Sequence, residues 1–497
     1  MKNDKNFVLA YDLGTSSLKA SVVDACGNVL ASCAKEYPTY DFADGRHEQN
    51  PMDWWNCLVE TTNTLFTENK ELRLKIIEIA LSGHSLGVVA VNKNGELLEE
   101  RTPIWSDTRA ESQTHTFFEK VDRKDWYATT GNGFNPCLYS VFKMMWYKEH
   151  KPLIYEKTEK FLGTKDYLNF ILCGVMATDP SYASGSGVYD LRKGCYDLEY
   201  IRASGVQAEK FANIVPSDCI LGNLTEESAK RLGLSSDVCV IAGGVDNACM
   251  SLGAGCIEVG DTYVSLGTSA WVATASRDPK ADKQERINTW AHCIKGLYLP
   301  SAGVYSAGSA LNWAMGHFAG IDTFEALEKV VASVPTGADG VMFVPVLSGG
   351  ASTDESPFMK GLLCGVHLGT TQGEIAKAVL EGIAMEMRLA EEAIAEVAEL
   401  GDTVRFVGGG ASGKALLSVF ADVWNKNIEK SSVGRQCATL GAAALAFVAC
   451  GIWKDYNVLY ALHKVEGHFQ PNAKNASIYN TLMQRFRLAC ECSAKLY

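Results

Sequence analysis

The chain has 497 residues and a formal net charge of −12, with 47% hydrophobic and 21% charged residues. Chains of this length divide into two or more domains, and the composition is that of a soluble globular protein rather than a disordered one. The acidic balance argues against a general nucleic-acid binder and against docking on an anionic membrane surface.

The first predicted element is a hairpin with a polar turn. Apolar residues 7–11 lead to Asp12, and Gly14, Thr15 and Ser16 follow before a second apolar strand. Small polar residues gather at hairpin turns for backbone reasons alone. The alternative is a phosphate-binding turn, in which backbone N–H groups and hydroxyls bind an anion beside a carboxylate that holds hydrated Mg²⁺. This stretch by itself leaves both interpretations open.

Strands and helices then alternate, which is typical of an α/β fold. Asn50 followed by Pro51 and the acidic Asp53 predicts a helix start. Further predicted strands lie at 76–82, 341–346 and 403–407, and helices at 374–400 and 415–424.

Two polar side chains near predicted strands are candidate substrate contacts. His84 lies in SGHSLG, directly after the strand that ends at Ser82, and Asp107 lies in TPIWSDTRA. A single His or Asp in such a place is more often a structural residue with its hydrogen bonds satisfied. Neither residue alone therefore establishes a site.

Asp246 and Asn247, in IAGGVDNACMSLGAG, follow a strand and a Gly-Gly turn and precede a helix rich in small residues. They could simply cap that helix. A carboxylate in this position could also accept the proton of a substrate hydroxyl, which is the role of the base in kinases.

A short repeat links the two halves of the chain. DLGTSSLKASVV, from Asp12, is echoed by SLGTSAWVATAS, from Ser265, and both copies place LGTS between two strands. The matching flanks predict a duplicated core. A boundary near Gly253 would then give two related domains, 1–253 and 254–497, with a cleft between them.

A glycine-rich turn, from Gly408 to Lys414, nearly matches the P-loop pattern GxxxxGK[ST]. The match fails at Ala415, which has no hydroxyl for Mg²⁺. A P-loop NTPase is therefore the alternative from another class. A nucleotide-facing turn at a helix N-terminus is the interpretation we favour, since such N–H groups suit phosphate or ribose.

The last predicted helix is the small-residue stretch LGAAALAFVACGIW, from Leu440, which is too short to span a bilayer and indicates tight internal packing. Sixteen cysteines show no Cys-x-x-Cys pair and no metal-ligand spacing, which is typical of a reducing cytoplasm. The polar start MKNDKN does not fit a secretory leader. We therefore expect a cytoplasmic protein without membrane association.

Together the motifs resemble those of the FGGY family of carbohydrate kinases, within the actin/hexokinase/Hsp70-like ATPase superfamily, over essentially the whole chain. HEQNPMDWW, from His47, is similar to the family's helix start E-x-D-P-x-x-W-W. The first family signature is present loosely as Ser140, Lys143, Trp146 and Glu149-His150, and the second fits well as GLLCGVHLGTTQGEIAKAVLE. The other matching motifs are YDLGTSSLK, GGVDN, SLGTS, AGSALNW and VGGGASG.

The resemblance implies two ribonuclease-H-like α/β domains around a central cleft, with the sugar mainly on 1–253 and ATP mainly on 254–497. Asp12 would organise Mg²⁺, and Thr15 would face the γ-phosphate, which favours the phosphate-binding interpretation of the first turn. The remaining residues implied to bind the nucleotide are Ser16, Gly267, Thr268, Gly308, Asn312, Gly410 and Lys414.

Asp246 matches the family's catalytic base, and the implied substrate contacts are His84, Asp107, Asp246 and Asn247. The pattern is closest to the xylulokinase branch, with two departures. That branch usually carries Gln-Met-His-Gly where this chain has His-Ser-Leu-Gly at 84–87, and Ser-Gly-Glu-Arg where it has Ser-Gly-Gly-Ala at 348–351.

The predicted function is ATP-dependent phosphorylation of a terminal hydroxyl of a ketopentose such as xylulose. Ribulose, erythritol and glycerol are the alternative acceptors. Two further alternatives are an actin- or Hsp70-like ATPase with no small acceptor and a sugar sensor with weak catalysis. The expected partners are the sugar and ATP, without nucleic acid, and a homodimer is left open.

Overall fold

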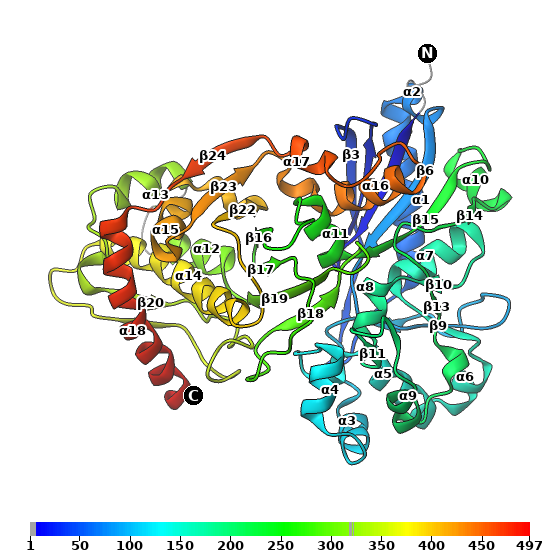
Figure 1. Cartoon of the computed structure of the whole chain (residues 1–497), viewed down its shortest axis with the longest axis horizontal. Helices are drawn as coiled ribbons and strands as arrows, with labels where there is room; N and C mark the ends of the chain where they lie inside the picture. The colour runs from blue at the N-terminus through cyan, green and yellow to red at the C-terminus, as the bar shows by residue number, and fades with distance from the viewer. Residues whose placement is uncertain (1–5, 318–320, 322) are drawn as a thin grey trace.

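The computed structural model describes residues 6–317, 321 and 323–497. Two bodies are visible, each built around one mixed β-sheet (Figure 1). The six-stranded sheet has the order β14 (Ile220–Asn223), β15 (Cys239–Val245), β6 (Ile76–Gly83), β1 (Phe7–Leu13), β2 (Ser17–Val23) and β3 (Val29–Glu36). The seven-stranded sheet has the order β18 (Asn288–Ala291), β19 (Tyr298–Val304), β17 (Ala270–Thr274), β16 (Thr262–Leu266), β22 (Thr403–Val407), β23 (Asn427–Ser431) and β24 (Val465–Phe469).

The two sheets repeat one pattern of strand directions. In the first, β1 forms a hairpin with β2 and lies parallel to β6, and β15 extends the parallel part. In the second, β16 forms a hairpin with β17 and lies parallel to β22, and β23 extends the parallel part. Antiparallel edge strands, β14 and β24, close the two sheets in the same way. The structure thus confirms the duplicated α/β core.

Helices pack on these sheets as the sequence patterns indicate. In the first body, α1 (Pro51–Glu68) begins at Asn50, whose side chain accepts a hydrogen bond from the Met52 N–H. In the second, α14 (Gln372–Ala395) and α15 (Lys414–Trp424) bury their apolar faces in the core around β22. The predicted helix 374–400 ends early, because the chain turns back toward β22 after Ala395, and the predicted strand 341–346 is the shorter β20 (Met342–Val344).

Helix α16 (Cys437–Ala449) comes late in the sequence but lies on the first sheet (Figure 1). It is the buried helix predicted from Leu440. Next to it, Lys19 Nζ donates to the Arg435 carbonyl at 2.8 Å, and Trp453 Nε1 donates to the Ala25 carbonyl at 2.9 Å. The chain therefore passes between the bodies more than once. The domain boundary near Gly253, where the chain would first enter the second body, stays a prediction.

Helix α16 crosses α11 (Asp246–Gly253) with the two backbones in contact. A Cβ atom on Gly441 would lie 1.9 Å from the Cys249 carbonyl oxygen, and one on Gly253 would lie 1.8 Å from the Cys437 carbonyl oxygen. Both positions therefore need glycine. Figure 1 shows this helix pair between the two sheets. A movement of one body relative to the other would therefore act on the contact between α11 and α16.

Among the helices that the structure describes, none has the length and apolar character needed to cross a membrane. All sixteen cysteines are free thiols.

Candidate active site

The predicted carboxylates meet at one edge of the first sheet. Asp12 at the end of β1 pairs in register with Ser82 of β6, and Ser82 Oγ donates a hydrogen bond to Asp12 Oδ1 at 3.0 Å. Gly83 pairs with Val245 of β15, so Asp246 begins α11 at the same edge. The carboxyl ends of parallel strands are where α/β sheets bind ligands.

A cavity of about 370 Å³ opens at this edge. Its near side carries Thr15, His84, Asp246 and Asn247, and its opposite wall comes from β17, β18 and β19 of the second body. Figure 1 shows β18 and β19 reaching toward α8 (Pro180–Ala183) of the first body. The volume is within the range of small-molecule sites, and both bodies contribute to the lining.

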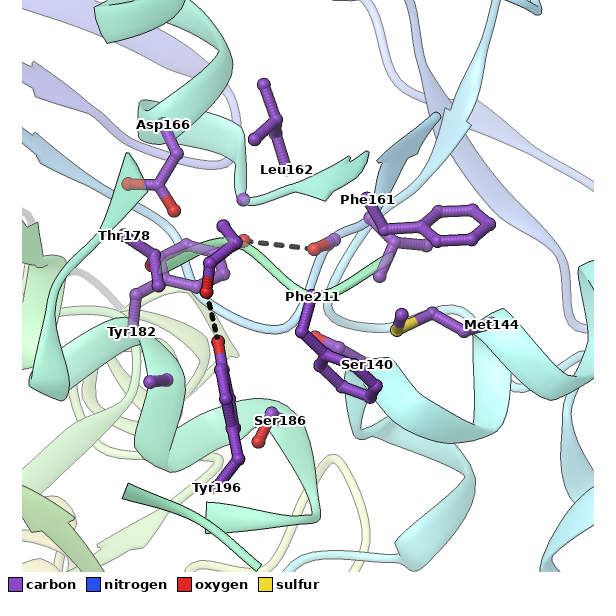
Figure 2. A pocket seen from close by; sticks show the side chains of 15 residues that line it. Ser140, Met144, Phe161, Leu162, Asp166, Thr178, Tyr182, Ser186, Tyr196 and Phe211 are labelled. Atoms are coloured by element: carbon purple, nitrogen blue, oxygen red, sulfur yellow. Dashed lines mark hydrogen bonds between the residues drawn. The ribbon is translucent and has the colours of Figure 1, made fainter. Parts of the chain in front are cut away.

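A second cavity, of about 30 Å³, lies close to the turn 84–87 among residues that include Ser140, Met144 and Tyr182 (Figure 2). A cavity of this size has room for only about two water molecules. It is therefore too small for a sugar.

Asp246 has the acid–base properties of a general base at neutral pH. Burial, with a smaller contribution from the nearby Asp12 carboxylate, raises the pKa of Asp246 to about 7, against the opposing effect of a hydrogen bond from the Asn247 N–H at 2.7 Å. A positioned base works best when its pKa lies near the operating pH. The side chain also borders the larger cavity, where it can reach a ligand.

Two residues that line this cavity carry buried polar atoms without partners. In the described part of the chain, neither ring nitrogen of the buried His84 meets a hydrogen-bond acceptor or donor, and Asn247 Oδ1 also has none. Burial, together with the nearby Lys143 ammonium, lowers the pKa of His84 to about 3, so its ring is neutral and offers one donor and one acceptor. Buried polar groups without partners are costly, and the hydroxyls of a bound ligand would satisfy them.

The cavity contains no fixed positive charge: no lysine or arginine is among the described residues that line it. Its aromatic lining includes Trp105, Trp271, Trp290 and Tyr305. Such a lining suits an uncharged ligand with apolar C–H faces and hydroxyl groups better than an anion.

The second LGTS turn, which joins β16 to β17, is fixed against the start of α12 (Gly308–His317). The Gly308 N–H donates to the Gly267 carbonyl at 2.9 Å, and the Ser309 N–H donates to the Thr268 carbonyl at 3.0 Å. A Cβ atom on Gly308 would lie 2.3 Å from the Gly267 carbonyl oxygen, so this position requires glycine. Gly267 and Thr268 themselves are exposed, as a turn that binds phosphate has to be.

The glycine-rich turn before α15 lies beside the same strand. A Cβ atom on Gly410 would lie 2.8 Å from Leu266 Cγ of β16. The first N–H of α15, at Lys414, donates to Glu328 Oε1 at 2.9 Å, and the Lys414 side chain is exposed. A carboxylate at this helix N-terminus opposes binding of a triphosphate there, which disfavours the P-loop interpretation.

Comparison with known proteins identifies the family. The model for the N-terminal domain of the FGGY family of carbohydrate kinases matches residues 7–253, and the model for its C-terminal domain matches residues 262–450. The chain is an FGGY carbohydrate kinase. Kinases of this family use ATP. The alternative of a P-loop NTPase, which has another fold, therefore does not apply to this chain.

Several relatives match this FGGY kinase over nearly its whole length. A xylulose kinase of Staphylococcus epidermidis is 30% identical over 482 residues, which cover 96% of this chain and 94% of the relative. A gluconokinase of Bacillus subtilis is 26% identical over 494 residues, covering 97% and 95%. The ligand-bound xylulose kinase structure from Lactobacillus acidophilus superposes with a TM-score of 0.91 at 24% identity, covering 99% of this chain and 100% of that one. The two-body fold is thus that of xylulose kinase structures.

The kinase brings most of the predicted site residues together. Asp12, His84, Asp246 and Asn247 lie at one sheet edge, with Thr15 in the adjoining turn, and Ser16 of that turn is exposed. The predicted nucleotide residues of the second body surround the second LGTS turn or lie on the helices that start beside it, namely Gly267, Thr268, Gly308, Asn312, Gly410 and Lys414.

The predicted sugar contact Asp107 is engaged by neighbouring residues. Its carboxylate is fully buried, is not part of the cavity lining, and accepts hydrogen bonds from the His47 N–H at 2.8 Å and from Arg109 Nε at 2.8 Å. Arg109 also pairs with Glu48 at 2.6 Å. In this conformation Asp107 therefore fixes the segment that follows Trp105, and its role as a sugar contact stays a prediction.

Sequence reasoning missed two parts of the lining. Trp105 is 40% exposed and lines the cavity. Its Nε1 donates a hydrogen bond to Thr15 Oγ1 at 2.9 Å, so it contacts the first LGTS turn as well. It stands in the quoted segment TPIWSDTRA, where an aromatic residue beside polar ones was an available signal. The wall formed by Asn288, Trp290 and their neighbours gave none, because only the folded chain brings β18 to the first body.

Proposed function

We propose that this FGGY kinase transfers the γ-phosphoryl group of ATP to a terminal hydroxyl of an uncharged ketose or polyol, with a ketopentose such as xylulose as the preferred class. The observation that carries the proposal is the partly buried Asp246, with its pKa raised to about 7, in a cavity lined also by His84 and Asn247, which carry unpaired polar atoms. These groups can bind hydroxyls, and the carboxylate can accept a proton from one of them.

The choice between a neutral sugar and a sugar acid rests on charge. The relatives include xylulose kinases and gluconokinases at comparable identity, so similarity alone does not separate the two substrates. A carboxylate ligand is ordinarily bound by arginine or lysine, and the described lining offers neither. The neutral ring of His84 does not supply the missing charge. An uncharged acceptor therefore fits better than gluconate.

In the reaction, Asp246 accepts the proton of the terminal hydroxyl as that oxygen attacks the γ-phosphorus in line with the leaving ADP oxygen. The two LGTS turns, in which Ser16 and Thr268 are exposed, are placed to bind the phosphoryl oxygens as negative charge develops on them. The two turns come from different bodies, so both can reach one triphosphate only when the bodies approach. Closure also excludes water that would compete as acceptor.

Asp12 is the residue that would hold Mg²⁺. One carboxylate oxygen of Asp12 accepts the Ser82 hydroxyl at 3.0 Å, and the carboxylate is near enough to Asp246 to raise the pKa of that side chain. Mg²⁺ in such enzymes is held by one or two carboxylates, waters and substrate phosphates, so the residue present fits. The ion would neutralise charge on the β- and γ-phosphates.

The sixteen free cysteines support a cytoplasmic location for this reaction.

The proposed function is tested by measuring kcat/KM with ATP and Mg²⁺ for D-xylulose, D-ribulose, D-fructose, erythritol, glycerol and D-gluconate. A site that hydrogen-bonds particular hydroxyls rejects analogues that lack them by orders of magnitude. We expect one neutral favourite with kcat/KM at least about tenfold above the others. A flat profile, or D-gluconate as the best substrate, would refute the proposal.

A further inference from the structure

The turn from His84 to Gly87 carries backbone strain beside the sugar cavity. Leu86 has a φ of 64°, a left-handed conformation that glycine adopts readily but that is unfavourable for a bulky residue such as leucine. Leu86 and His84 are both among the residues that line the cavity. Such strain persists only where the surroundings enforce it, and it is found at functional sites.

Buried side chains from three different helices bind the carbonyls of this turn. Thr164 Oγ1 donates to the His84 carbonyl at 2.6 Å, and Lys143 Nζ donates to the Leu86 carbonyl at 3.1 Å. Tyr182 Oη donates to the Gly87 carbonyl at 3.1 Å, one of the bonds drawn in Figure 2. Thr164 starts α7 (Thr164–Cys173), Lys143 is on α5 (Ser140–His150), and Tyr182 is on α8.

The ammonium group of Lys143 is completely buried. Its two hydrogen bonds go to backbone carbonyls, those of Leu86 and Leu138, and both of these residues line the sugar cavity. Burial lowers the pKa of Lys143 to about 7, although Asp107 opposes the effect. A buried charge costs several kcal/mol of stability, and an apolar side chain of the same length would avoid that cost. The lysine at this position is therefore explained by the hydrogen bonds that its Nζ donates, and not only by the space that its side chain fills.

We propose that Lys143, together with Thr164 and Tyr182, is a positioning residue that holds the strained turn so that His84 stays at the wall of the sugar cavity. This inference rests on the proposed sugar kinase function and adds residues that do not themselves face the substrate. Releasing one carbonyl lets the turn relax toward negative φ at Leu86, which moves His84 away from the sugar. The consequence is weaker sugar binding without a matching loss in nucleotide binding.

The test compares Lys143→Met with Lys210→Met. Lys210 is also buried in the same body and donates to a backbone carbonyl, that of Thr158 at 2.7 Å, which is outside the site. We expect KM for the best sugar of the panel to rise about tenfold or more in Lys143→Met, with KM for ATP changed less than twofold. Lys210→Met should leave both KM values near wild type.

A second pair of variants covers the case in which Lys143→Met does not fold. Thr164→Val removes the donor to the His84 carbonyl while keeping shape, and Thr158→Val is its control, since the buried Thr158 hydroxyl bonds only within its own helix turn, to the Ile154 carbonyl at 2.8 Å. The same rise in sugar KM is expected for Thr164→Val alone.

Hydrogen–deuterium exchange of a peptide covering 82–88 gives a readout that does not depend on activity. Exchange there should be faster in Lys143→Met and Thr164→Val than in either control. Sugar KM and exchange at control levels in both variants would overturn the inference. A wild-type enzyme without kinase activity on any sugar would instead overturn the proposed function, so the two failures are distinguishable.

Discussion

The substitution Asp246→Asn separates chemistry from binding in this kinase. Asparagine keeps the size of the side chain and can still accept the hydrogen bond that the Asn247 N–H donates to Asp246 at 2.7 Å. It cannot take the proton of the sugar hydroxyl. Loss of a positioned general base typically lowers the rate by about 10²–10⁴-fold, which corresponds to roughly 3–5 kcal/mol of activation free energy.

The same substitution should stabilise the protein at alkaline pH. Burial and the Asp12 carboxylate hold the pKa of Asp246 near 7 in the folded state, above the value of about 3.9 for an exposed aspartate. The penalty on the folded state therefore grows as pH rises from about 4 to 7, is complete above pH 7 and is absent below pH 4. Each tenfold change in proton affinity is about 1.4 kcal/mol, so relief on the order of 2–4 kcal/mol is expected at pH 8 and little at pH 4.

The assay is steady-state kinetics on the preferred sugar, with ADP affinity measured by calorimetry and melting temperature measured at pH 5 and pH 8. Asp218→Asn is the control, because Asp218 accepts a hydrogen bond from Tyr456 at 3.2 Å and does not border the cavity. We expect low kcat, unchanged ADP affinity and a higher melting temperature at pH 8 for Asp246→Asn only. Turnover within fivefold of wild type would refute the assignment of Asp246 as base.

Three further outcomes are expected. Because the base must be ionised and its pKa is about 7, kcat/KM of the wild type should fall about tenfold per pH unit below pH 7; a flat profile from pH 5 to 8 would contradict this. Lys414→Ala should weaken ATP binding by about tenfold or less and preserve kcat, since the side chain is exposed and the N–H of its helix start is taken by Glu328; a variant that binds ATP but does not turn over would support a P-loop-like lysine instead. Gly441→Ala should lower the free energy of unfolding by about 1–3 kcal/mol, because its Cβ would lie 1.9 Å from the Cys249 carbonyl oxygen. It should also reduce the compaction that we expect small-angle scattering to show when sugar and nucleotide bind. The control Gly316→Ala, with no atom near its Cβ, should behave as wild type.

The fold was predictable where local pattern and repeat agreed. The LGTS turns at Gly14 and Gly267 identified two equivalent hairpins. The strands predicted at 76–82 and 403–407 prove to be the parallel neighbours of these hairpins. The placement of α16 on the first sheet was not predictable in the same way, because its small residues indicate tight packing but not the partner. The partner is fixed by the backbone contact of Gly441 with α11.

The candidate site likewise contains residues whose position could be inferred from the sequence and residues whose position could not. Asp246 and His84 follow β-strands directly, so their position at one sheet edge could be inferred from sequence. Asp107 has the same local signature, but its carboxylate is taken up by Arg109, and no local pattern distinguishes a free carboxylate from a paired one. The wall that includes Trp290 depends on contacts between the two bodies, which sequence periodicity does not encode.

The most direct test of the account is a competition in one vessel. The enzyme is given ATP, Mg²⁺ and equal concentrations of the neutral sugars of the panel and D-gluconate, and the phosphorylated products are identified by mass spectrometry alongside the ADP released. A cavity with an ionisable Asp246 and no lining cation predicts one neutral sugar monophosphate, formed in equal amount with ADP. Phosphogluconate as the main product, or ADP without any sugar phosphate, would contradict it.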